Sequence, residues 1–425
     1  MPCGRACGIL SMGARACVPY KLSMRVLFLS TWFPYPLSQG SKIRAYYLLR
    51  ALAGQHDVCL ISFADTQIQP EWTAHLSHLC SRVEIVERNP FSAGAARSFA
   101  GKLSLRPSTV VSTHSPEMAD RARRVAAEWR PDCVVGLTFV TAPYALQTPG
   151  VPAIVDVDNL LSHMLYESYR NQHGGLRRLR AWLAWWKFRR YERELFQQFD
   201  AGIVVSQRDQ RELGQLLPVA GRCRRIEVIA NGVDLERNIA GLAAPVPGRM
   251  VFSGALSYHA NYDAMQYFIG EVLPRIQAVE PAARLYITGR TDQVDLHGLA
   301  MTDRVVLTGY LDDVRPAVAS AQVSVAPLRI GAGTRLKILE AMALGTPVVS
   351  TAKAAEGLEV DNGRHLFIED TPEGFSRAVV ALLRNSEQRE SLIRQARQLV
   401  EDKYDWRAIG MRLCTLVDEV CQAHG

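Results

Sequence analysis

The sequence predicts an α/β protein made of two doubly wound, Rossmann-like domains that face a central cleft. Short apolar strand patterns alternate with helical patterns along nearly the whole chain. The strand patterns are almost continuously apolar, as parallel strands covered on both faces require. The alternation restarts after an Ala/Pro/Gly-rich stretch near residues 235–249, and 425 residues suffice for two large domains.

In the first half, the sequence predicts helices at 43–52 and 116–129, and a long helical region before the last strand. Strands are expected at 26–30, 57–63, 83–86, 132–135, 153–157 and 202–205. The residues before Met24 carry short apolar pieces broken by basic residues, without the apolar centre of a signal peptide. We therefore expect a loose extension at 1–23, a functional start at Met24 and a first domain at 24–235.

In the second half, a helix is expected at 260–276 and strands at 250–253, 284–288, 305–308, 323–326 and 348–350. These elements predict a linker at 236–249, a second domain at 250–402 and a final helix at 403–425 that packs back towards the first domain. Ligands of doubly wound sheets bind at the carboxyl ends of the strands, so two facing sheets predict one shared cleft.

The composition is that of an ordinary globular protein, with 48% hydrophobic and 21% charged residues, which excludes disorder, collagen and coiled coil. A net charge of +7 suits anionic ligands or an anionic membrane surface without specifying nucleic acid. The nine cysteines form no C-x-x-C pair, so we expect neither zinc nor a disulfide framework, and a reducing, cytoplasmic compartment. The sequence contains no run of about 18 apolar residues, so we expect no transmembrane helix.

The most informative segment runs from 327 to 347. A strand ends there, the loop Gly331, Ala332, Gly333 and Thr334 follows, and a helix then continues to Gly345. Glycine backbone and a helix N-terminus favour an anion, and two cations, Arg335 and Lys337, lie beside them. Glu340, one turn further, can accept hydrogen bonds from the diol of a ribose. Diphosphate and ribose together indicate a nucleotide or nucleotide sugar; the alternative is a plain Lys337–Glu340 ion pair on the helix surface.

Two other nucleotide motifs are excluded by the residues present. The first strand pattern is followed by Thr-Trp-Phe-Pro-Tyr-Pro at 31–36, without the G-x-G-x-x-G of dinucleotide-binding enzymes. No G-x-x-x-x-G-K-[ST] phosphate loop occurs either.

At this point the chain resembles the retaining GT-B glycosyltransferases of the group-one, or family-four, type. The resemblance covers nearly all of 24–423 and rests on the segments 33–36, 40–44, 231–234 (Asn-Gly-Val-Asp), 252–254, 327–347 and 404–406. It is greatest for sugar transferases associated with exosortase-type exopolysaccharide loci, which share Asp-Val-Asp-Asn at 156–159.

The resemblance implies retaining transfer from an NDP-sugar, with no metal and no cofactor. It implies that Glu340 binds the donor ribose and that Arg335 and Lys337 face the diphosphate. It assigns the remaining donor contacts to Gly331, Ala332, Gly333, Thr334, Gly254, Asn261, Tyr310 and Leu311. The sequence departs from many relatives in three places: Ala332 replaces a first Glu, 254–261 lack an Arg and a Lys, and 136–138 lack a His.

On the acceptor side we expect Gly40, Asp156 and Asp158. The two carboxylates flank the end of a strand and could orient an acceptor hydroxyl; the alternative is that Asp158 and Asn159 cap a helix. His259 follows Gly254 and would face the cleft near the diphosphate.

The segment 177–193 has the most unusual composition. Seven basic residues interleave with three Trp, Phe188 and Tyr191. Such a helix can lie on an anionic membrane surface; alternatively, the tryptophans pack on the sheet and the arginines face water. A nucleic-acid interface is not expected, because no nucleic-acid-binding module surrounds the segment.

These observations predict a hexosyltransferase-type enzyme that moves a sugar from an NDP-sugar to a polysaccharide or lipid-linked saccharide in exopolysaccharide or cell-envelope glycan synthesis. It would be cytoplasmic, with peripheral contact with the inner membrane. The alternatives are a non-catalytic nucleotide-sugar-binding subunit of a polysaccharide assembly complex, motivated by Ala332 and the missing His, and an NDP-sugar epimerase.

Overall fold

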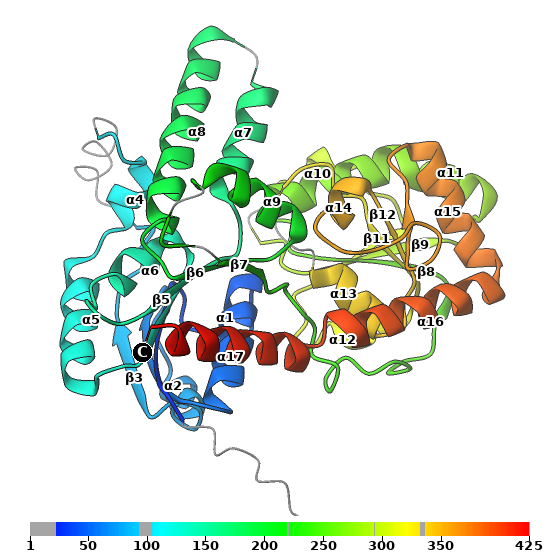
Figure 1. Ribbon diagram of the computed structural model, residues 1–425. Coiled ribbons are helices and arrows are strands. Elements are labelled where there is room, and N and C mark those ends of the chain that lie inside the picture. Colours follow the sequence, from blue (N-terminus) through cyan, green and yellow to red (C-terminus); the bar gives the residue numbers. More distant parts are fainter. Residues whose placement is uncertain are drawn as a thin grey trace, which may run out of the picture.

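The structure is a computed structural model that describes residues 23–92, 104–172, 174–218, 221–223, 225–292, 294–331 and 336–424. Two parallel sheets form the centres of two α/β domains that lie side by side (Figure 1). The predicted fold class is therefore confirmed. The expected extension at 1–23 lies almost entirely outside the described residues.

The first domain is built on a seven-stranded parallel sheet with the order β3-β2-β1-β4-β5-β6-β7. Alternate residues of its central strands enter two apolar cores, one on each face. The strands are β1 Arg25–Ser30, β2 Asp57–Phe63, β3 Arg82–Val86, β4 Cys133–Leu137, β5 Ala153–Val157, β6 Ala201–Val204 and β7 Arg225–Val228. The sequence did not predict β7, because this edge strand is half-buried and alternates charged with apolar residues.

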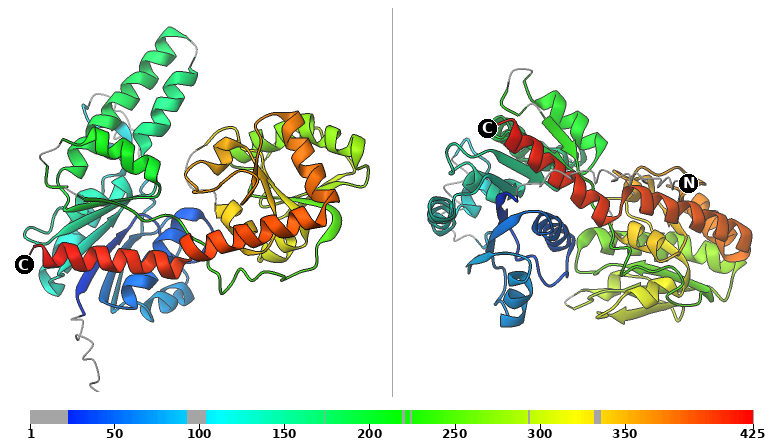
Figure 2. Two further views of the ribbon diagram at one scale, coloured as in Figure 1. Left: turned by 45° about the vertical axis from the view of Figure 1, so that its right-hand side comes forward. Right: turned by 60° about the horizontal axis from the view of Figure 1, so that its bottom comes forward.

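Helices cover both faces of this sheet, and two of them project from it. They are α1 Gly40–Ala53, α2 Pro70–Ser77, α4 Ser108–Thr113, α5 Pro116–Trp129, α6 Thr138–Ala145, α7 Leu161–Asn171, α8 Gly175–Phe196 and α9 Gln207–Leu216. Helix α5 begins as predicted, with Pro116 in its first turn and the Ser115 hydroxyl accepting from Met118 N–H. Helices α7 and α8 form a hairpin that extends away from the body of the protein (Figures 1 and 2).

The second domain is built on a six-stranded parallel sheet with the order β10-β9-β8-β11-β12-β13. Its strands are β8 Val246–Ser253, β9 Arg284–Thr288, β10 Val305–Gly309, β11 Ala321–Ala326, β12 Val348–Ser350 and β13 Phe367–Ile368. Strand β8 begins inside the predicted linker, because Val246 pairs with Ala321 across a local irregularity of the ladder. Pro247 and the positive φ of Gly248 hid this start in the sequence.

The helices of this domain are α10 His259–Tyr267, a π-helical turn at Phe268–Val272, α11 Leu273–Val279, α12 Arg315–Ala319, α13 Leu336–Ala343, α14 Ala352–Ala355, α15 Pro372–Arg384 and α16 Ser386–Lys403. A short 3₁₀ turn spans Leu296–Gly298. In the part of the chain that the structure describes, no helix combines the length and apolarity needed to cross a bilayer.

The last helix, α17 Trp406–Gln422, returns to the first domain (Figure 1). Trp406, Ile409 and Leu413 enter the core beneath β1 and α1. The Trp406 ring stacks on Tyr47 with centroids 5.1 Å apart. An isolated bridge between Val233 and Asp405 pairs the two chain segments that connect the domains.

Candidate functional site

A cavity of about 170 Å³ lies between the domains beside α13. Leu336, Glu340 and Leu344 line it from the second domain. The other lining residues come from the loop before α12 and from α12 itself, from the connection 232–238, and from the first domain with α17: Asp312, Asp313, Val314, Arg315, Val318, Leu37, Ile43, Tyr47 and Trp406. The cavity therefore lies at the carboxyl ends of the second sheet's strands, where doubly wound sheets bind ligands.

Glu340 is placed by the burial of the rest of its helix. Ile338, Leu339, Ala341, Met342 and Ala343 are buried in the second core, which directs Glu340 towards the cavity. Burial raises the pKa of the Glu340 carboxyl, and the charge of Lys337 partly opposes this. No residue that the structure describes donates a hydrogen bond to the Glu340 carboxylate. Its acceptor capacity is thus left to a ligand, and a pair of sugar hydroxyls would satisfy it.

Lys337 joins three segments that are far apart in the sequence. Its ammonium donates to Asn261 Oδ1 at 3.0 Å and lies 4.0 Å from the centre of the Phe252 ring. A Cβ at Gly254 would lie 2.7 Å from both Lys337 Nζ and Asn261 Nδ2, and Gly254 has a φ of +155°. Only glycine therefore fits there. The structure brings the predicted residues Lys337, Asn261 and Gly254 together, and the ammonium is directed towards Asn261 in place of the simple pair with Glu340.

The glycine loop is described only at its first residue. Ala332, Gly333, Thr334 and Arg335 lie outside the described residues. Gly331, with a φ of +98°, and His259 line a second interdomain cavity of about 600 Å³. Helix α7 forms the opposite wall of this cavity. His259 thus faces the space between the domains, as the sequence predicted.

Tyr310 and Leu311 follow β10 in a loop that leads directly to Asp312 and the first cavity. The Tyr310 ring is 60% exposed and lies 5.2 Å from the Arg290 guanidinium. This loop therefore borders the same cavity as Glu340.

The predicted acceptor-side carboxylates are held by residues of the first domain. Asp156 is 1% exposed and receives two hydrogen bonds from Arg44, at 2.6 and 2.8 Å. Burial raises the pKa of the Asp156 carboxyl, and Arg44 opposes this. Arg44 also donates to Asn231 Oδ1 at 3.0 Å. Asp156 therefore forms a buried ion pair that ties α1 and β5 to the interdomain connection.

Asp158 is partly exposed and accepts from Asn231 Nδ2 at 3.1 Å and from Ser41 at 3.5 Å. The alternative of a helix cap is wrong, because α7 has Leu160 at its N-cap and no side-chain cap. A Cβ at Gly40 would lie 3.6 Å from Leu336 Cδ1, so Gly40 marks the place where the domains meet. The acceptor-side role of Gly40, Asp156 and Asp158 stays a prediction.

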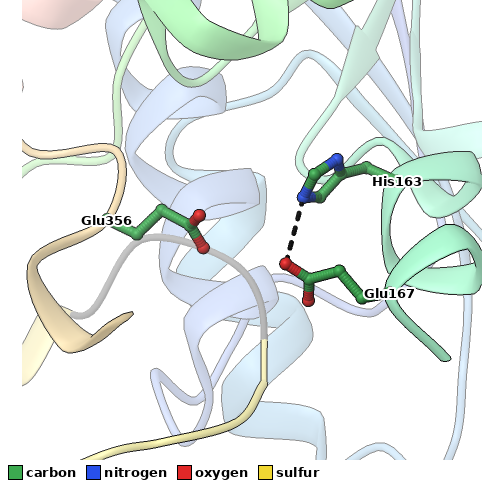
Figure 3. Close-up of side chains that lie close together, drawn as sticks. All are labelled: His163, Glu167 and Glu356. Carbon is green, nitrogen blue, oxygen red and sulfur yellow. Dashed lines mark hydrogen bonds and ion pairs between the residues drawn. The ribbon is translucent and has the colours of Figure 1, made fainter. Parts of the chain in front are cut away.

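An ionic network across the domain boundary was not predicted. Lys353 of α14 bonds Glu167 of α7 and Glu356, both at 2.7 Å. Arg208 of α9 pairs with Glu356, and His163 lies 3.3 Å from Glu167 (Figure 3). Ligand atoms of His163, Glu167 and Glu356 approach within 4.8 Å of one another. Because Lys353 and Arg208 hold these carboxylates, the arrangement is an ion-pair network that joins the domains. No signal in the sequence linked α7, α9 and α14.

Two facing Rossmann-like domains, with a carboxylate and Gly331 at the space between them, are the arrangement of the GT-B class of group-transfer proteins. Residues 38–237 match the family model of Glycosyltransferase Family 4. Residues 247–385 match that of Glycosyl transferases group 1. Since both of its domains match glycosyltransferase family models, the chain belongs to the GT-B glycosyltransferases.

Curated relatives match part of the chain. The phosphatidyl-myo-inositol mannosyltransferase of Mycobacterium leprae is 30% identical over 156 residues, which are 35% of this chain and 41% of that protein. That of Mycolicibacterium smegmatis is 29% identical over 161 residues, 36% and 40% of the two chains. The matches thus span less than half the length of these relatives.

Solved structures match over nearly the whole chain. Sucrose-phosphate synthase from Thermosynechococcus elongatus superposes with a TM-score of 0.68 and 16% identity, over 94% of this chain and 100% of that one. The Anabaena protein Alr3699/HepE in complex with UDP and glucose gives 0.64 and 16%, over 93% and 100%. At these identities the likeness shows the GT-B fold.

Proposed function

We propose that this protein transfers a hexose from a nucleoside diphosphate sugar to a saccharide or lipid-linked saccharide acceptor, with retention at the anomeric carbon. The observation that carries the proposal is the Glu340 carboxylate, which lines an interdomain cavity and receives no hydrogen bond from the described residues. Two neighbours flank this carboxylate. Lys337 supplies a cation, and the loop after β10 supplies a surface against which a nucleotide base can lie.

In this proposal the nucleoside enters the cavity beside α13. The ribose hydroxyls donate to Glu340, and the base lies against the loop that contains Tyr310 and Leu311. The diphosphate extends towards Lys337, with Arg335 as its second cationic partner. Asn261 orients the Lys337 ammonium through the 3.0 Å hydrogen bond.

The reaction breaks the bond between the anomeric carbon and the phosphate oxygen and forms a bond to an acceptor hydroxyl oxygen. The acceptor proton leaves with the departing diphosphate. Lys337 stabilises the negative charge that develops on the leaving group, and a fixed cation in a site shielded from water is effective for this purpose. Retention, and the absence of a need for metal or cofactor, rest on the resemblance of the 327–347 segment. Closure of the domains excludes water, which would otherwise hydrolyse the donor.

The acceptor class is supported by the curated relatives, which are named for transfer to phosphatidyl-myo-inositol. We propose a lipid-linked or polysaccharide acceptor in exopolysaccharide or cell-envelope glycan synthesis, at the cytoplasmic face of the inner membrane. Nucleic acid has no part in this function.

A non-catalytic nucleotide-sugar-binding subunit is the second candidate, because Ala332 stands where many relatives have a first glutamate. An epimerase is the third, since a putative UDP-N-acetylglucosamine 2-epimerase from Listeria monocytogenes shares the fold with a TM-score of 0.57.

A panel of NDP-sugars, screened by thermal stabilisation, tests all three. A donor present at 100 times its Kd stabilises the protein by about 2.7 kcal/mol. The stabilising donor is then incubated with saccharide and lipid-linked acceptors. Release of NDP with a new glycoside supports the transferase. Binding without turnover supports the subunit, and an isomerised sugar supports the epimerase.

A further inference from the structure

Five large apolar side chains are exposed on the outer face of α8. Leu176, Leu179 and Leu183 are 63%, 56% and 40% exposed. Trp182 and Trp186 are each 38% exposed, with their rings stacked 6.5 Å apart. At 3.6 residues per turn these side chains share one face about 120° wide. We call Leu176, Leu179, Trp182, Leu183 and Trp186 the apolar stripe.

The opposite face of α8 is the one that packs. Trp185 stacks on Tyr169, with planes 6° apart, and contacts Tyr166 at 5.2 Å, both on α7. The alternative that the tryptophans pack on the sheet is therefore wrong for this helix, because Trp185 packs on α7 and the other two face outward. Since α7 satisfies the inner face, the hairpin does not need the apolar stripe for its own packing.

Arginines border the apolar stripe. Arg178 lies over Tyr169 at 5.2 Å and Arg189 over Trp185 at 5.8 Å, which holds both at the edge of the inner face. Residues 175–190 contain no Asp or Glu and carry six basic residues: Arg177, Arg178, Arg180, Lys187, Arg189 and Arg190. An apolar face with basic borders and tryptophans matches the interface of an anionic bilayer.

Other occupants fit this surface less well. A second copy of the chain would bring arginine against arginine across the contact. A nucleic acid would account for the arginines but would leave Leu176, Leu179 and Leu183 in water. An anionic bilayer satisfies both groups of side chains.

The hairpin also forms part of the interdomain space. Helix α7 and the residues after it line the cavity of about 600 Å³, across from Gly331 and His259. Arg170, Arg329 and Lys353 line the same cavity together with Glu167. Arg329 is paired with Asp263 and Lys353 with Glu167, so among the described residues Arg170 is the cation there that is left to bind an acidic group. Helix α7, which has 11 residues, thus connects the free end of the hairpin to this cavity.

We propose that the α7–α8 hairpin docks on an anionic membrane through the apolar stripe and delivers the phosphate-bearing headgroup of a lipid-linked acceptor to the cavity beside α7. The docking is argued only from the apolar stripe and its basic borders, whereas the delivery of the headgroup rests on the proposed function. Docking raises the local concentration of an acceptor that cannot leave the bilayer.

Co-sedimentation with vesicles tests the docking. The full chain is incubated with vesicles of phosphatidylcholine alone or with about one third phosphatidylglycerol, at low and high salt. We expect at least tenfold stronger binding to the anionic vesicles, reduced by salt because the charges are screened within about 8–10 Å. Trp182→Ala with Trp186→Ala should reduce that binding at least tenfold. The control Ile239→Ala with Leu242→Ala removes two apolar groups that are 55% and 42% exposed elsewhere, and should bind as the parent.

Several results would overturn the docking. They are recovery of the parent in the supernatant with both vesicles, equal binding to both, or undiminished binding of the tryptophan variant. A concentration-dependent dimer that the tryptophan variant abolishes would assign the stripe to a second copy. Unchanged melting of the variant in thermal denaturation shows that its fold is intact.

Transfer assays separate this proposal from the function on which it rests. With a short-chain, water-soluble acceptor, the tryptophan variant should turn over like the parent. With the same headgroup on a long-chain lipid in anionic vesicles, its KM should rise about tenfold. Equal KM values in vesicles would refute the delivery. Vesicle binding by a parent that has no transferase activity would instead refute the proposed function and leave the docking intact.

Discussion

Replacing Glu340 by glutamine should weaken donor binding and, at the same time, stabilise the free protein. The carboxylate faces a cavity, no described residue donates to it, and burial raises its pKa. A raised pKa means that the folded state favours the neutral acid, so the ionised group lowers stability as the pH rises through its folded pKa. Glutamine has nearly the same shape and no charge, so it removes this cost.

The magnitudes follow from the contacts. A hydrogen bond to a charged group contributes about 1.5–3 kcal/mol, so the loss of one such bond weakens donor binding roughly 10- to 150-fold. Each kcal/mol gained by the free enzyme shifts its Tm by roughly 2–4 °C for a domain of this size. The gain should grow as the pH rises from the usual range of a glutamate towards the raised pKa of the folded state, because the parent loses its proton in that direction and the variant has none to lose.

Thermal melting across pH 5–8, with and without the stabilising NDP-sugar, measures both effects. The alanine variant serves as a control for volume, because it also removes the charge but leaves a void. A glutamine variant that melts below the parent at pH 8 would refute the argument, since it would mean that the carboxylate has an internal partner. Donor affinity within about twofold of the parent would remove Glu340 from the ribose site.

Three further predictions concern other parts of the cleft. Lys337→Ala should lower the rate of NDP release about 100- to 1000-fold with a smaller effect on the fold, since one preorganised group that stabilises developing charge is worth that much; single-turnover assays measure it, and a loss below fivefold contradicts it. Gly232→Ala should destabilise the protein by about 1–3 kcal/mol, because the added Cβ would lie 2.7 Å from Ile409 Cδ1 and from Tyr404 O. Gly214→Ala in α9, with nothing within 4 Å, is its matched control and should stabilise by about 0.5–1 kcal/mol in urea denaturation. Lys353→Ala should open the cleft by removing its 2.7 Å bond to Glu167 across the domain boundary, and should increase the radius of gyration measured by small-angle scattering; an unchanged radius would contradict a role of Lys353 in holding the domains together.

Much of the fold could be predicted because its strands are buried on both faces. Strands β2, β5, β9 and β12 have the predicted bounds, since a continuous apolar run between polar turns has few other interpretations. The edge strands β7 and β13 were missed, because they are short and half-buried and lack such a run. The edge strands β3 and β10, by contrast, were predicted to within one residue of their bounds, so the apolar run, and not the place in the sheet, decides which strands the sequence identifies.

The residues of the candidate site could be predicted where their functional groups lie close together in the sequence. Lys337 and Glu340 stand on one helix after a glycine loop, so a single segment carries the signal. The association of Lys337 with Asn261 and Gly254 required the family resemblance, because 76 residues separate the two hydrogen-bonded side chains. Asp156 was expected to face an acceptor, but no local pattern reveals that Arg44, 112 residues earlier, would hold it. The ionic network of Lys353 could not be predicted for the same reason, because no local pattern links residues that lie so far apart in the sequence.

The return of α17 to the first domain has a consequence for synthesis of the chain on the ribosome. Trp406, Ile409 and Leu413 belong to the core beneath β1, yet they are translated after the entire second domain. The first domain therefore emerges with one face of its sheet incomplete, while the second domain, whose core draws on residues 233–404, can fold before it. Domains usually mature from the N-terminus as the ribosome advances, at about 5–20 residues per second. We therefore expect the first domain to mature last, so that the nascent chain exposes apolar surface beside α1 for roughly 10–30 seconds longer than its position would suggest.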